Sequence, residues 1–239
     1  LSSPAQQAAP APKPEAANAS STWNPENIEV ICASGNCPAQ VGALIFSKPA
    51  PNGRLNLTRC TAFLVAPQTI MSNGHCDGTS AGRGWFVTQK LNGRKEIREI
   101  STLAFKRFTP SPKGEEFTSG RPDAALFTLS SPLNLAPLRL AQGTQRPFTK
   151  LIAYAILRAD GDNLILDKAE CEVRRHEAEF PFDILEAPDM IKSFGCELPP
   201  GSSGSPMFAP GSDEVQALQV GGTTPKRRAE LAKRPLQIF

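Results

Sequence analysis

The residues of this sequence best suited to chemistry are one serine, one histidine and one aspartate. Ser203 lies in the run Gly201–Pro206 (Gly-Ser-Ser-Gly-Ser-Pro), whose glycines permit a tight turn that exposes a hydroxyl. A serine hydroxyl becomes an effective nucleophile only when a neighbouring base takes its proton. His75, one of two histidines in the chain, and Asp123, which opens an apolar run, are suited to act as a base and its orienting acid. Together they predict a nucleophilic site.

The order and surroundings of the three residues are more specific than any one of them. Taken singly, a loop serine, a packed histidine and an aspartate at a strand start are ordinary features. Here they follow the order His, Asp, Ser, and Cys60 and Cys76 frame the histidine. This arrangement, over roughly residues 28–225, resembles the chymotrypsin-like (trypsin-like) serine protease family. Ser202 before the nucleophile and Ser205 shortly after it are similar, more narrowly, to the bacterial glutamyl-endopeptidase-like branch.

The resemblance implies a serine endopeptidase. In that mechanism Asp123 orients the imidazole of His75, and His75 takes the proton of Ser203. Ser203 then attacks a peptide carbonyl and forms an acyl-enzyme, which water releases. The main-chain N–H groups of Gly201 and Ser203 would form the oxyanion hole.

Two other function classes stay open. A catalytically silent, protease-like binding protein would keep the fold without the reaction, although such a protein usually loses one of the three residues. An esterase could use the same residues on another fold, but α/β hydrolases place the histidine last in the chain, whereas here it comes first. Labelling by a fluorophosphonate probe, followed by an assay on a mixed peptide library, separates the possibilities.

The primary specificity pocket has two possible linings. Glu197 lies six residues before Ser203, where trypsins hold an acid, so its carboxylate could pair with a Lys or Arg of the substrate. Alternatively the Pro-Pro pair that follows stiffens the loop and turns Glu197 outward, and Leu198 and Gln219 line a pocket for a small or polar residue. The expected substrate-binding residues are Glu197, Gln219, Val220, Gly221 and Gly222.

Two positions depart from the patterns that the resemblance would supply. Ser202 stands where trypsins carry a buried Asp that pairs with a new N-terminus, so we do not expect activation by N-terminal insertion. Gln219 stands where glutamyl endopeptidases carry a specificity histidine, so strict glutamate specificity is not expected.

Six cysteines, an even number, predict disulfides and an oxidising compartment. Spacing alone does not choose among the possible pairings. A zinc site built from His75, Cys76 and other thiols is an alternative, disfavoured because the chain has no C-x-x-C pair. The resemblance pairs Cys60 with Cys76 and Cys171 with Cys196, and the remaining Cys32 and Cys37 can close a small loop.

The composition sets limits on partners and location. The chain has 239 residues, 40% of them hydrophobic, which is enough to bury a sizeable core, and its formal charge is +3 with no basic stripe. We expect protein or peptide substrates, no nucleic-acid partner, no cofactor, no metal, and a monomer. No apolar run approaches the roughly 18 residues of a membrane span. With the cysteines, this predicts a secreted or periplasmic protein whose signal peptide is absent from the chain as given.

Short apolar runs separated by turn signals predict an all-β fold. Their spacing is typical of antiparallel barrels, and the resemblance implies a chymotrypsin-like double barrel with a short C-terminal helix. Thr224 and Pro225 would begin that helix and Pro235 would end it, although the basic residues there fit a solvated tail equally well. The expected strands cover residues 28–31, 41–46, 55–65, 85–91, 96–105, 124–129, 151–157, 164–174, 207–209 and 215–220.

These elements predict three regions. Residues 1–27, rich in Ala and Pro, would form a disordered arm, because they have too few large apolar side chains to offset the entropy of ordering. Residues 28–140 would form an N-terminal barrel carrying the histidine, after a hairpin, and the aspartate, at the start of a strand. Residues 141–239 would form a C-terminal barrel carrying the serine, with the terminal helix.

Overall fold

The structure is a computed structural model with almost entirely β architecture. The helices in the part that it describes are two short 3-10 segments, η1 (Pro25–Asn27) and η2 (Gly74–Cys76). The described residues are 23–50, 55–79, 82–107, 123–142, 150–174, 192–194, 196 and 198–219. The strands are β1 (Glu29–Cys32), β2 (Val41–Pro49), β3 (Leu55–Ala66), β4 (Thr69–Ser72), β5 (Arg83–Thr88), β6 (Ile97–Arg107), β7 (Ala124–Leu129), β8 (Arg139–Leu140), β9 (Lys150–Asp160), β10 (Asn163–Arg174), β11 (Lys192–Phe194), β12 (Pro206–Phe208) and β13 (Glu214–Leu218).

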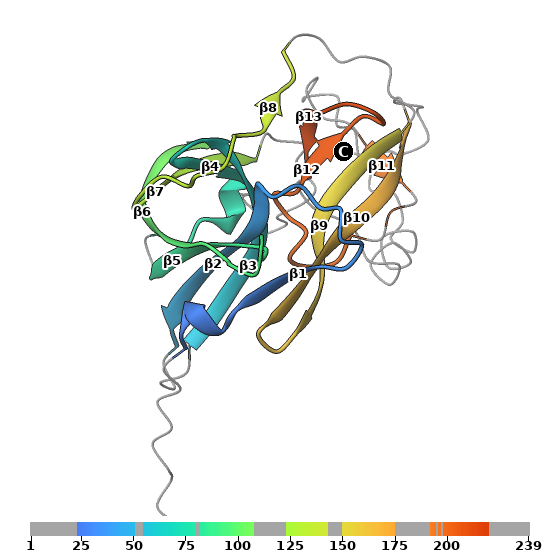
Figure 1. Ribbon diagram of the computed structural model, residues 1–239. Coiled ribbons are helices and arrows are strands. Elements are labelled where there is room, and N and C mark those ends of the chain that lie inside the picture. The colour runs from blue at the N-terminus through green and yellow to red at the C-terminus, as the bar shows by residue number, and fades with distance from the viewer. Residues whose placement is uncertain are drawn as a thin grey trace, which may run out of the picture.

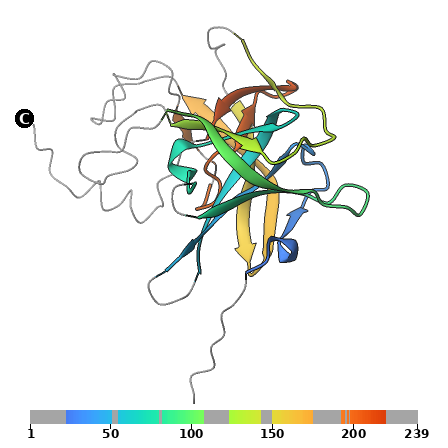
Figure 2. The same cartoon turned by 90° about the vertical axis from the view of Figure 1, so that its left-hand side faces the viewer.

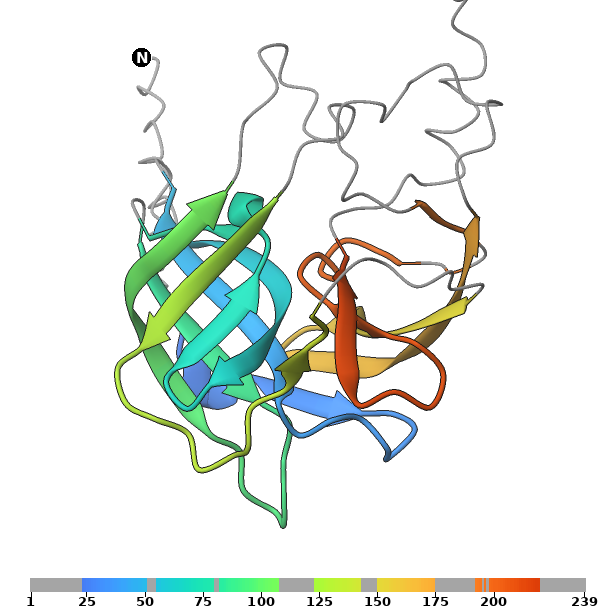
Figure 3. The same cartoon turned by 90° about the horizontal axis from the view of Figure 1, so that it is seen from above.

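The strands form two sheets that lie side by side (Figure 1 and Figure 3). One closes into a barrel in the order β2-β3-β4-β7-β6-β5, in which neighbouring strands pair in antiparallel. The other has the order β1-β10-β9-β12-β13-β8, and β11 also pairs with β10. The all-β class with two barrel-like sheets is therefore confirmed. The predicted terminal helix lies outside the described residues.

Strand β2 of the closed barrel also faces the second sheet, which explains the apolar run from Val41 to Phe46. Leu44 and Phe46 belong to the core inside the closed barrel. Ala43 and Ile45 belong to a second core, which also contains Ile156 of β9. Because successive side chains of a strand point to opposite faces, a strand covered on both faces loses its polar alternation. Strand β2 thus joins the barrel to the second sheet.

Strand β1 belongs to the second sheet, whereas the predicted division at residue 28 placed it in the first barrel. It pairs in parallel with β10, with Glu29 opposite Asn163. Ile28 and Val30 are buried in the core shared by both sheets. Strand β8 also joins the second sheet, in parallel with β13. A local apolar pattern predicts a strand but not its partner, because the partner depends on which distant face the strand covers.

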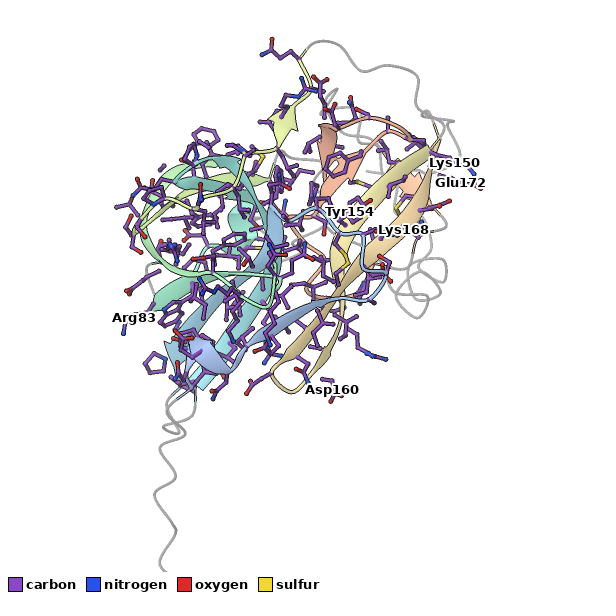
Figure 4. The ribbon with its side chains drawn as sticks, viewed as in Figure 1. Arg83, Lys150, Tyr154, Asp160, Lys168 and Glu172 are labelled. Carbon is purple, nitrogen blue, oxygen red and sulfur yellow. A yellow bond between two sulfur atoms is a disulfide. The ribbon has the colours of Figure 1, made fainter. Side chains whose placement is uncertain are left out.

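Order begins before the predicted end of the disordered arm at residue 27. Asn24 caps η1 by accepting the N–H of Glu26, and Trp23 packs against Trp85 with ring centroids 4.8 Å apart. The guanidinium of Arg83 lies over the same Trp85 ring, and Figure 4 shows Arg83 at the outer edge of β5. Residues 23–27, within the range predicted as an arm, therefore belong to the folded structure, because Trp23 supplies a large aromatic side chain that packs on Trp85. Residues 1–22 lie outside the described part of the chain.

An ionic cluster ties β1 to the connection between β5 and β6. The carboxylate of Glu29 lies 2.8 Å from the ammonium of Lys90 and 3.0 Å from that of Lys95. The hydrogen bond from Lys90 does most to hold the pKa of Glu29 below its ordinary value. Burial opposes it, and the hydrogen bond and charge of Lys95 add to the lowering. Lys95 also donates to the main-chain oxygens of Glu26 and Ile28. The cluster therefore fastens the start of the second sheet to the first barrel.

Three disulfides join the cysteines, and all three have the predicted pairing. They are Cys32–Cys37, Cys60–Cys76 and Cys171–Cys196. No helix within the described ranges is long and apolar enough to span a membrane.

Candidate active site

The pairing of β4 with β7 brings His75 to Asp123. Strand β4 runs into Asn73 and η2, and Asp123 stands immediately before β7. The two strands are antiparallel, with Ser72 opposite Ala125. The end of one strand therefore lies beside the start of the other, and Figure 2 shows η2 beside the beginning of β7.

Both carboxylate oxygens of Asp123 engage His75. Oδ2 lies 2.5 Å from the ring Nδ1, and Oδ1 accepts the main-chain N–H of His75 at 3.0 Å. Asp123 is buried, while the side chain of His75 keeps 16% of its surface exposed. A carboxylate at Nδ1 fixes the ring orientation and favours the tautomer in which Nε2 is the acceptor. The pair can therefore present a basic Nε2 to a neighbouring hydroxyl.

A turn from residue 199 to 202 leads into Ser203. The N–H of Ser202 donates to the carbonyl of Pro199 at 3.1 Å, and Gly201 has a φ of +103°. Proline at the second position of a turn and a glycine with positive φ at the third are typical of a type II turn. The Pro-Pro-Gly sequence thus favours the turn seen here. A residue with a side chain at position 201 would oppose its positive φ.

The turn docks on β3 through Thr61. The main-chain N–H of Thr61 donates to the carbonyl of Ser203 at 2.9 Å, and Thr61 Oγ1 donates to the carbonyl of Gly201 at 2.9 Å. Thr61 follows Cys60, whose disulfide partner Cys76 follows His75. These contacts bring the half-buried Ser203 to the same end of the barrel as the histidine.

Gly204 permits this close approach. A Cβ at Gly204 would lie 2.1 Å from Ser72 Oγ and 2.2 Å from the carbonyl oxygen of Thr61, and its φ is +85°. Ser72 in turn donates its hydroxyl to Thr61 O at 2.8 Å. Both the space and the backbone conformation therefore require glycine after Ser203.

The far side of the turn is held by Gln219 and Ser205. The N–H of Gly204 donates to the carbonyl of Gln219 at 2.8 Å, and the N–H of Gln219 donates to the carbonyl of Ser205 at 2.9 Å. Ser205 Oγ donates to the carbonyl of Ser202 at 2.6 Å, and Ser202 is buried. Gln219, expected in the substrate pocket, is buried and supports the turn through its main chain.

The site residues predicted from the sequence lie together where the structure describes them, and three further residues support them. His75, Asp123, Ser203, Gly201 and Gln219 converge as above, whereas Glu197, Val220, Gly221 and Gly222 lie outside the described residues. Sequence reasoning missed Thr61, Ser72 and Asn73. The one indication of their role in the sequence is that they lie close to Cys60 or His75 in the chain. The main-chain carbonyls that they bind have no sequence signature.

The chemistry of the cysteines beside His75 disfavours the alternative of a zinc site. Ligand atoms of Cys60, His75 and Cys76 lie within 4.8 Å of one another. The two sulfur atoms are joined in a disulfide, so neither offers the thiolate that binds zinc.

Comparisons with known proteins agree with this fold. A family model described as Trypsin matches residues 31–235. HL collagenase is similar in structure, with a TM-score of 0.54 and 15% identity over 72% of this chain and 77% of that chain. The scabies mite inactivated protease paralogue S-I1 has a TM-score of 0.53 and 17% identity over 77% of this chain and 83% of that chain. No curated protein sequence gives a significant match.

Proposed function

This chain belongs to the trypsin family, and we propose that it is a serine endopeptidase whose nucleophile is Ser203. Its substrates would be proteins or peptides. The single observation that carries the proposal is the buried carboxylate of Asp123 on the ring Nδ1 of His75, at 2.5 Å. A structural histidine needs no such partner, whereas a general base needs a fixed ring and a defined tautomer.

In the proposed reaction, the proton of Ser203 Oγ moves to His75 Nε2 while Oγ bonds to the peptide carbonyl carbon. The imidazolium then gives that proton to the leaving amine as the C–N bond breaks. Water, activated by the same nitrogen, releases the acyl group and restores Ser203. Asp123 keeps its negative charge throughout and stabilises the imidazolium.

The oxyanion would be bound by the main-chain N–H groups of Gly201 and Ser203. The positive φ of Gly201 and the docking of its carbonyl on Thr61 support this, because they fix the turn before substrate arrives. Removal of one such donor costs about 3 to 4 kcal/mol of transition-state stabilisation in comparable sites.

A catalytically silent binding protein remains the alternative to test. The fold does not separate the two functions, since one similar structure is described as an inactivated protease paralogue. The contacts of Asp123 with His75 favour the peptidase.

The finer parts of the proposal concern specificity and location. The glutamyl-endopeptidase-like branch rests on the run Gly-Ser-Ser-Gly-Ser alone. The primary pocket would use Glu197 for a basic substrate residue, or Leu198 and Gln219 for a small or polar one. The cleavage profile of Glu197→Gln decides between them, because only the first lining predicts that cleavage after Lys and Arg falls sharply. Three disulfides support an extracytoplasmic protein.

The test is hydrolysis of a mixed peptide library, read by mass spectrometry. We expect cleavage by the wild-type protein and none by Ser203→Ala. Ser101→Ala, an exposed serine on β6, is the matched control and should retain full activity. Robust cleavage by Ser203→Ala, or no cleavage by the wild type, would overturn the proposal.

A further inference from the structure

Asn73 is a fully buried polar residue beside the candidate site that the proposed chemistry does not use. It connects β4 to η2 and directly precedes Gly74 and His75. Its Nδ2 donates to the main-chain carbonyl of Asp123 at 2.7 Å. The side chain therefore spans from the histidine segment to the aspartate segment.

The position of Asn73 would ordinarily predict another role. It stands at the N-cap of η2, where an asparagine usually accepts a main-chain N–H of the first turn. Its side chain makes no such capping bond. Among the described residues its Oδ1 has no hydrogen-bond partner, which is unfavourable for a buried amide. Within the described residues, the contact with Asp123 is thus the one hydrogen bond of this side chain.

The acceptor of that bond lies beyond the β4–β7 ladder. The last pair of the ladder at this end is Ser72 with Ala125. The Asn73 amide adds a bond to the main chain of Asp123 past that pair. This is the residue whose two carboxylate oxygens engage His75. A shift of this carbonyl would move the carboxylate with it.

We propose that Asn73 is a positioning residue, whose amide fixes the main chain of Asp123 so that the carboxylate stays aligned on His75. The inference rests on the proposed function, in which that alignment sets the orientation of the general base. Misplacement of a catalytic group by about 1 Å can reduce turnover by about a hundredfold. We therefore expect Asn73→Ala to lower kcat by about tenfold to a hundredfold and to leave KM unchanged.

The chain offers a matched control in Gln68. Its Nε2 donates to the main-chain carbonyl of Leu129 at 2.7 Å, so it also links the β3–β4 segment to β7 through a carboxamide. That bond lies at the other end of β7, away from Asp123. A merely structural role predicts similar effects for Asn73→Ala and Gln68→Ala, whereas a positioning role predicts a kinetic effect in the first alone.

The experiment measures kcat and KM on a cleaved library peptide, the denaturation midpoint, and the proton NMR resonance of the short His75–Asp123 hydrogen bond. We expect Asn73→Ala to lower kcat and to shift or broaden that resonance, and Gln68→Ala to change neither. Equal kinetic losses in the two variants, or a full kcat and an unchanged resonance in Asn73→Ala, would overturn the inference. If Asn73→Ala does not fold, Asn73→Ser is compared with Gln68→Ser by the same criteria.

The NMR measurement separates this inference from the proposed function. A wild-type protein that cleaves no peptide contradicts the proposed function, yet the resonance still reports whether Asn73 holds Asp123. An active wild type with an unaffected Asn73→Ala contradicts the positioning role alone.

Discussion

The two halves of the candidate site are held in place by different means. The His75–Asp123 half depends on an antiparallel ladder within a closed barrel, on buried side-chain contacts and on the Cys60–Cys76 bridge. The Ser203 half is a turn with glycines at positive φ on either side, and hydrogen bonds from the main chain and the hydroxyl of Thr61 to its carbonyls hold it against β3. Side-chain identity fixes the first half, and backbone conformation fixes the second.

The two halves should therefore be sensitive to different substitutions. The histidine half should respond to loss of a side chain or a bridge, because its geometry is transmitted through them. The serine half should respond to addition of a side chain at glycine, because its geometry depends on close approach and on a rare backbone conformation. Thr61 and Ser72 lie where the two halves meet. Thr61 Oγ1 donates to the carbonyl of Gly201 in the serine half, and Ser72 Oγ donates to Thr61 O. These last two oxygens also lie against Gly204.

The largest loss of stability is expected from Gly204→Ala. The new Cβ would overlap Ser72 Oγ and Thr61 O, at 2.1 and 2.2 Å, in addition to the strain of a positive φ. We expect destabilisation by about 2 to 6 kcal/mol and loss of peptide hydrolysis. Urea denaturation and the library assay measure the two effects.

Gly201→Ala is the matched comparison for that prediction. Its φ is also positive, at +103°, but among the described residues its Cβ would meet only Ile156 Cγ2 at 3.7 Å and Ile156 O at 3.9 Å. The cost should then be that of the backbone alone, about 1 to 3 kcal/mol. A Gly201 variant less stable than the Gly204 variant would contradict the assignment of close packing to Gly204.

An effect smaller than the upper range for Gly204→Ala is expected when the bridge of the histidine half is removed by Cys60→Ser with Cys76→Ser. The bridge joins residues 16 apart, for which loop closure predicts a stability loss of about 3 kcal/mol. Because it ties β3 to η2, fluorophosphonate labelling should also slow. Removal of Cys32–Cys37, whose cysteines are only 5 apart, should cost less and leave labelling unchanged. Equal slowing of labelling in both variants would show that the Cys60–Cys76 bridge has no special link to the site.

The smallest effect concerns the ionic cluster at Glu29, away from the site. Its lowered pKa means that the folded state favours the carboxylate, so the stabilisation is present above the ordinary value of 4.5 and is lost as the pH falls through the lowered pKa. Glu29→Gln should therefore cost about 0.5 kcal/mol at neutral pH, and the difference from wild type should shrink in acid. Denaturation curves across the acid range measure this, and a difference that widens in acid would refute it.

The chain order of the candidate residues was easier to read from the sequence than the pairing of the strands. Strand β7 was predicted with its observed bounds because it is a short apolar run that ends at two serines and a proline, and the order of His75, Asp123 and Ser203 was visible in the printed sequence. Strands β8 and β11 have two and three residues, too few to show a period. The parallel partner of β1 could not be predicted, because parallel pairing joins segments with no turn between them.

The supporting residues of the site were hidden for a related reason. Thr61 and Asn73 act on main-chain carbonyls, of Gly201 and Asp123, which any residue type would supply. Only the fold brings donor and acceptor together. Pocket specificity stayed a prediction, because Glu197 and Gly221 lie outside the described residues.

The most direct test of the central claim is covalent labelling by a fluorophosphonate probe, with the adduct located by peptide mass mapping. We expect one adduct per chain, on Ser203, formed rapidly in the wild-type protein and at a rate lower by several orders of magnitude in His75→Ala. A protein that stays unlabelled, an adduct on another residue, or an unchanged rate in His75→Ala would contradict the claim that His75 activates Ser203.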